Sequence, residues 1–80
     1  MPREELFLQD IIEAADAIER FLKNIKKADF LSNEILQSAV LHKLTIIGEA
    51  SARLPEDLRN RHFEIEWKPI IGLRNIVVHA

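Results

Sequence analysis

The sequence predicts an all-α protein, an up-and-down helical bundle that is completed by a second copy of the chain. Apolar residues recur at spacings of three and four, and no paired runs with a hairpin turn indicate a sheet. The chain has 80 residues and no cysteine, so no disulfide can stabilise its core. A single core of this size supplies only about 3–5 kcal/mol, and we therefore expect a homodimer.

The first segment is expected to form an amphipathic helix of about five turns that stops near Lys27. Lysines near its end favour that stop, because cations meet the negative end of the helix dipole there. The residues of its apolar stripe are Leu8, Ile11, Ala15, Ile18, Leu22 and Ile25, with Ile12 and Phe21 widening the stripe.

A second long helix is predicted from about residue 33 to 53, with Ser32 as its N-cap. It carries apolar residues on more than one side, so we expect it to be central and to contact several neighbours. Gly48 lies in its interior, where glycine costs about 1 kcal/mol relative to alanine. A second helix crossing closely at Gly48 would explain this cost, and the alternative is a tolerated glycine on a solvated face.

Proline and acidic residues mark the next helix, a short one at about 56–61, after Pro55 ends the long helix. Trp67 then opens a last, strongly apolar helix, with Pro69 in its first turn. We expect Trp67 to be a core anchor, and a base-stacking role is the alternative.

Composition excludes several classes of protein. The chain carries 11 Lys and Arg against 13 Asp and Glu, a net charge of −2, which argues against a generic nucleic-acid coat. Its apolar runs are shorter than a membrane span, and its start does not resemble a secretory signal. We therefore expect residues 1–80 to form one cytoplasmic domain.

One polar group interrupts the apolar C-terminal segment: Arg74, Asn75 and His79. On a helix, Asn75 and His79 share a face, whereas Arg74 lies about 140° away from His79. Two copies of this helix in a symmetric dimer would bring both histidines and both arginines to one cleft. The alternative is that Arg74 and His79 only pair with carboxylates or helix ends of the bundle.

The side chains of this cleft suit one reaction. An imidazole with a pKa of about 6.5 exchanges protons at neutral pH, and guanidinium groups bind phosphate oxygens. These properties match RNA cleavage by 2′-hydroxyl attack. His42, His62 and His79 lie in different predicted elements without metal-ligand spacing, so we expect neither a metal nor a cofactor.

Three stretches of the chain carry a family resemblance: Ile47-Gly48-Glu49-Ala50, Arg53-Leu54-Pro55, and Trp67 to Asn75 closing on His79. Together they resemble the HepT-like branch of the HEPN superfamily. The most specific element is Gly72-Leu73-Arg74-Asn75 with a histidine five residues after the arginine, which resembles that superfamily's R-x4-6-H ribonuclease motif. The likeness extends over nearly the whole chain, although the family's C-terminal helices are missing from it.

This resemblance implies the toxin of a toxin–antitoxin pair, an all-helical homodimer that acts as a metal-independent endoribonuclease. By the same likeness, Arg74 and His79 are the catalytic positions and Asn75 is the polar residue between them. Glu49 is expected to orient one of these side chains, with an ordinary inter-helix salt bridge as the alternative, and Arg53 to extend the RNA path. The partner implied is a minimal nucleotidyltransferase antitoxin.

Two other functions remain open at this point. The first is a catalytically silent helical dimer that binds a nucleotidyltransferase antitoxin or a nucleotide through Arg74 and His79. The second is a bare structural fragment of a bundle. Substituting Arg74 or His79 separates the enzyme from the silent dimer, because only the enzyme would lose RNA cleavage.

Overall fold

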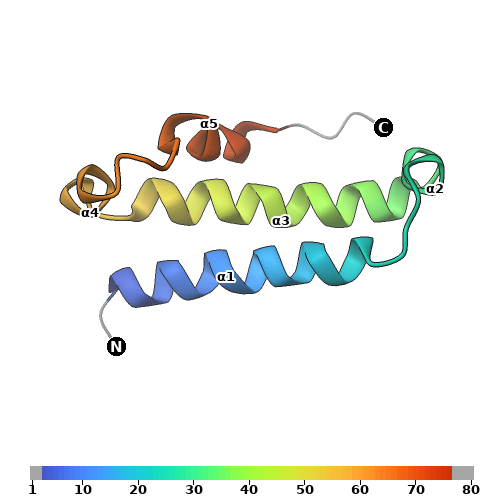
Figure 1. The fold of residues 1–80 in the computed structure, drawn as a ribbon, viewed down its shortest axis with the longest axis horizontal. Coiled ribbons are helices and arrows are strands. Elements are labelled where there is room, and N and C mark those ends of the chain that lie inside the picture. Colours follow the sequence, from blue (N-terminus) through green and yellow to red (C-terminus); the bar gives the residue numbers. More distant parts are fainter. Residues whose placement is uncertain (1–2, 77–80) are drawn as a thin grey trace.

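The computed structural model describes residues 3–76, in which every regular element is helical. The elements are α1 (Arg3–Leu22), α2 (Lys27–Leu31), α3 (Glu34–Arg53), α4 (Glu56–Arg61), α5 (Trp67–Gly72) and the 3₁₀ helix η1 (Leu73–Asn75). α1 and α3 run antiparallel, and α5 with η1 lies along the opposite side of α3 (Figure 1). The all-α fold and the central position of the second long helix are thus confirmed. No helix within the described range is both long and apolar enough to cross a membrane.

The first helix ends at Leu22, so the expected end near Lys27 is wrong. Asn24 follows with a φ of 60°, a left-handed conformation that interrupts the helix. Asparagine tolerates this conformation better than most residues, because its short side chain can bond locally to the backbone. The chain then forms the short helix α2.

The N-cap of α3 is Asn33, where the sequence favoured Ser32. The Asn33 side chain accepts a hydrogen bond from the backbone N–H of Leu36 at 3.0 Å. The Ser32 hydroxyl donates backward instead, to the carbonyls of Ala28 and Asp29, each at 3.2 Å. Serine and asparagine are both good N-cap residues. The Ser32 hydroxyl is already bonded to carbonyls of α2, so Asn33 caps α3.

We expect Asn33→Ala to lower the free energy of unfolding by about 1 kcal/mol, because the Leu36 N–H would lose its partner. Urea unfolding followed by circular dichroism measures the difference. Ser32→Ala is the matched control, since its bonds are exposed and belong to the short α2. An equal or larger loss for Ser32→Ala would contradict this assignment of the cap.

The interface between α1 and α3 is built mainly from small residues. Among the described residues, the buried hydrophobic ones are Ala14, Ala17, Val40, Ala50 and Leu54. The expected stripe of α1 is confirmed only in part. Its members Ile11, Ile18, Phe21 and Leu22 are half-buried, whereas Ala15 is exposed and Leu8 and Ile12 are 37% and 59% exposed. Ala14 and Ala17 are the buried residues of α1, and their small side chains allow the two helices to approach closely there.

The C-terminal part follows the prediction as far as Gly72. α4 forms at Glu56–Arg61, and α5 begins at Trp67 with Pro69 in its first turn. The half-buried Trp67 anchors α5 to α4, because its indole N–H donates to the carbonyls of Arg59 at 3.1 Å and His62 at 3.0 Å.

The expected continuous last helix is wrong beyond Gly72. There the chain tightens into η1, and Ile76 is extended, with φ −68° and ψ 123°. Ile76 opens a β-branched run, which disfavours helix because such side chains lose rotamer freedom against the preceding turn. His79 and its neighbours lie outside the described residues.

Candidate functional site

Gly48 lies where α5 and η1 cross α3. A Cβ built on Gly48 would lie 2.5 Å from the backbone nitrogen of Arg74 and 3.0 and 3.1 Å from the carbonyl oxygens of Ile70 and Ile71. Gly48 is buried, so the predicted close crossing is confirmed and the solvated-face alternative is wrong. The backbone of the motif arginine therefore rests directly on the central helix.

The side chains of Arg74 and Asn75 are exposed at this crossing. Within residues 3–76, the ion pairs are those of Arg53 with Glu49 and of His62 with Glu64, and neither involves Arg74. The alternative that Arg74 merely pairs with a carboxylate of the bundle has no support among these residues. Arg74 thus presents a guanidinium to solvent from a fixed backbone position.

Glu49 is next to Gly48, but its carboxylate pairs along its own helix. Its Oε1 lies 3.6 Å from Nε of Arg53, and the two side chains are 50% and 61% exposed. This is an i,i+4 pair within α3, worth only a few tenths of a kcal/mol at the surface. In this arrangement Glu49 holds Arg53, not Arg74.

His79 lies outside the described residues, and the structure therefore gives no distance between His79 and Arg74. The expectation that Asn75 and His79 share a helix face assumes a continuous helix, and the described chain departs from helical geometry at Ile76. The angular separation of Arg74 and His79 on an ideal helix therefore no longer applies.

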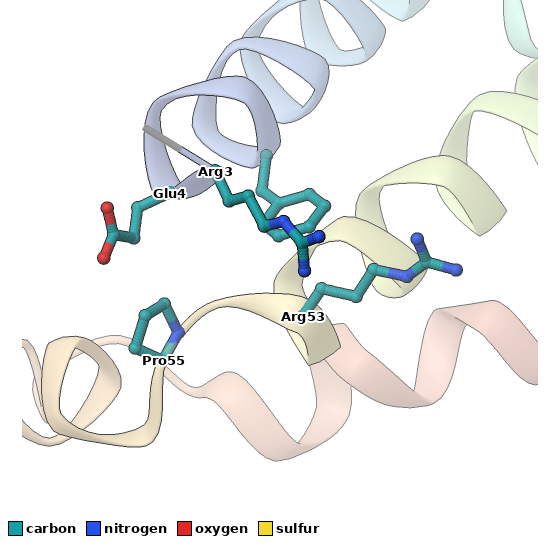
Figure 2. Close-up of a pocket in the computed structure, with 5 residues that line it drawn as sticks. Arg3, Glu4, Arg53 and Pro55 are labelled. Carbon is teal, nitrogen blue, oxygen red and sulfur yellow. The ribbon is translucent and has the colours of Figure 1, made fainter. Parts of the chain in front are cut away.

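A cavity of about 450 Å³ lies where the start of α1 meets the end of α3, lined by Arg3, Glu4, Phe7, Arg53 and Pro55. Figure 2 shows Arg3 and Arg53 reaching to the same side of this cavity, while the Glu4 carboxylate extends away from them. No motif in the sequence marks Arg3 as a site residue. The antiparallel pairing of α1 and α3 brings the start of one helix to the end of the other, so that Arg3 and Arg53 line the same cavity (Figures 1 and 2).

The other two histidines are His42 and His62, and neither they nor Trp67 belong to the Arg74 motif. His42 is exposed on α3, and Nδ1 of His62 lies 3.5 Å from the Glu64 carboxylate. The indole N–H of Trp67 is bonded to two carbonyls, in keeping with its predicted role as an anchor. Across residues 3–76, no three histidine, aspartate or glutamate side chains come together as metal ligands could.

Comparison with known proteins places these features in a family. The family model "Ribonuclease HepT-like" matches residues 11–80. The chain is 41% identical to "Putative RNase" of Methanocaldococcus jannaschii over 73 residues, and 42% identical to "Probable ribonuclease HepT" of Thermococcus cleftensis over 74 residues. These matches cover 91% and 92% of this chain and 67% of each relative. No solved structure matches significantly. The family match spans the long central helix, the crossing at Gly48 and the Arg74 motif, and the chain therefore belongs to the ribonuclease HepT-like family.

Proposed function

We propose that this chain is a metal-independent endoribonuclease, the toxin of a toxin–antitoxin pair. The observation that carries the proposal is Arg74: an exposed guanidinium, free of carboxylate partners among residues 3–76, on a backbone packed against Gly48. Arginine binds phosphate through a planar fork of N–H donors and stabilises charge added in a transition state. The matched relatives are named as ribonucleases, which supports RNA as the substrate.

The reaction we propose is attack of a ribose 2′-hydroxyl on the adjacent phosphorus. The imidazole of His79 accepts the 2′-hydroxyl proton as the new O–P bond forms, and the bond to the 5′-oxygen breaks. A histidinium, supplied by the second copy of the chain, returns a proton to the leaving 5′-oxygen. The products are a 2′,3′-cyclic phosphate and a 5′-hydroxyl end. Arg74 binds the nonbridging oxygens, and the Asn75 amide lies beside it as a further hydrogen-bonding group.

The cleft in this proposal is composite and needs a homodimer. The exposed apolar residues of α1 support dimerisation, since the large side chains of Leu8 and Ile12 remain 37% and 59% exposed in the described part of the chain. The core within one copy is also small, because three of its five buried hydrophobic residues among those described are alanines. A second copy would bury more apolar surface and supply the second Arg74 and His79.

The proposed RNA path passes beyond the motif. Arg3 and Arg53 line one cavity together with Glu4, and in this proposal the two guanidinium groups bind further phosphates of the RNA. The partner of the toxin would be a minimal nucleotidyltransferase antitoxin, as the family resemblance implies. An RNA substrate and such a partner would place the pair in the cytoplasm.

The test incubates the purified chain, and separately its His79→Ala variant, with a mixed RNA in excess EDTA. We expect the parent alone to cleave, leaving 2′,3′-cyclic phosphates, because His79 is the proposed base and no metal is required. End-group analysis of the fragments measures the outcome. Linear 3′-phosphates from the first turnover, or cleavage that stops with EDTA, would contradict the mechanism.

Intact RNA with both proteins would reject the ribonuclease. In that case, the affinities of the parent and of the Arg74→Ala variant for the nucleotidyltransferase are compared. Binding by the parent would identify the silent dimer. Loss of affinity in the variant would assign Arg74 to a protein contact.

A further inference from the structure

We infer that Gly48 is a positioning residue for Arg74, whose backbone can take its place on α3 only because residue 48 has no Cβ. The consequence for catalysis rests on the proposed function, whereas the positioning itself is a property of the fold. Gly48 touches neither RNA nor a reacting atom in this proposal. It acts only through the placement of Arg74.

The first support is the kind of atom that Gly48 meets. All three atoms nearest to the built Cβ belong to the backbone of α5 and η1, and the nearest, at 2.5 Å, is the nitrogen of Arg74 itself. A side chain at such a distance could rotate away, but a backbone atom cannot. Any larger residue at position 48 must therefore move the segment that carries Arg74.

The second support is the tether at the other end of this segment. The indole of Trp67 holds the start of α5 against α4 through two hydrogen bonds, at 3.1 and 3.0 Å. Because that end is fixed, α5 cannot slide as a whole to make room for a Cβ at Gly48. The displacement would then fall on η1, the part of the segment that carries Arg74.

The third support is the contrast with Gly72, the other glycine of the chain. A Cβ built there meets nothing within 4 Å, and its φ of −60° and ψ of −20° suit any residue. Gly72 precedes Arg74 by two positions, so it shares the same local segment. The chain thus offers one glycine whose missing Cβ sets the position of Arg74 and a nearby one whose missing Cβ does not.

The experiment compares the 80-residue parent chain, Gly48→Ala and Gly72→Ala by NMR and by RNA cleavage kinetics. In the parent, an NOE should connect the Gly48 α-protons with the Arg74 amide proton. Gly48→Ala should shift the Arg74 amide resonance and lower kcat by about 10²-fold, with a smaller change in KM, because a misplacement of about 1 Å has that cost. Gly72→Ala should leave the kcat of the parent unchanged.

Several results would overturn the inference: no NOE in the parent, a Gly48→Ala variant with the parent's Arg74 resonance, or an equal loss of kcat in Gly72→Ala. If the parent itself cleaves no RNA, the proposed function fails, and the NOE and the Arg74 resonance still decide the positioning. If Gly48→Ala does not fold, the NOE in the unmodified chain decides it.

Discussion

Replacing Arg74 with alanine is expected to lower kcat for RNA cleavage by about 10²–10³-fold, the usual cost of removing one preorganised donor from a developing negative charge. The fold should be unaffected, because the Arg74 side chain is exposed and takes part in no ion pair within residues 3–76. Initial rates on a defined RNA, together with far-UV circular dichroism, measure both effects.

Two further variants sharpen this prediction. Arg74→Lys keeps the charge but loses the planar fork, so its kcat should fall between those of the parent and Arg74→Ala. Arg20→Ala removes the same charge from an exposed position on α1 and should cleave at the rate of the parent. A similar loss in Arg20→Ala would mean that net charge, not the placement of Arg74, controls the rate.

Leu54→Ala is expected to lower the free energy of unfolding by about 2–5 kcal/mol. Leu54 is the C-cap of α3, is only 2% exposed, and is the largest fully buried side chain in the described part of the chain. Its truncation leaves a cavity in a core whose other members are mostly alanines, which cannot expand to fill it. The expected loss is a large fraction of the stability of a domain of this size.

Urea unfolding at one fixed protein concentration measures this loss, since the stability of a dimer depends on concentration. Leu31→Ala is the matched control. It makes the same substitution at a side chain that is 63% exposed, and it should change the stability by less than about 0.5 kcal/mol. Equal losses for the two variants would show that Leu54 is not the centre of the core.

Local signals in the sequence were sufficient for several elements. Pro55 and the acidic residues after it set the boundary between α3 and α4, and Pro69 in a first turn marked the start of α5. These signals work because proline and end charges act within one helical turn. Two other boundaries were missed because no such local signal marks them. These are the end of α1, where Asn24 is left-handed, and the start of α3, where Asn33 and not Ser32 is the N-cap.

The sequence by itself determined the family and the all-helical fold, and it predicts Arg74 and His79 as the residues of the candidate site. Only the tertiary structure decided that the Ala14 and Ala17 face of α1 turns inward, that Arg3 joins Arg53 at one cavity, and that Glu49 pairs along its own helix. It also decided that the Arg74 backbone rests on Gly48. Residue type and spacing fix what a segment can form, because those constraints act within a few residues. Which surfaces then meet depends on how closely backbones distant in the sequence can approach.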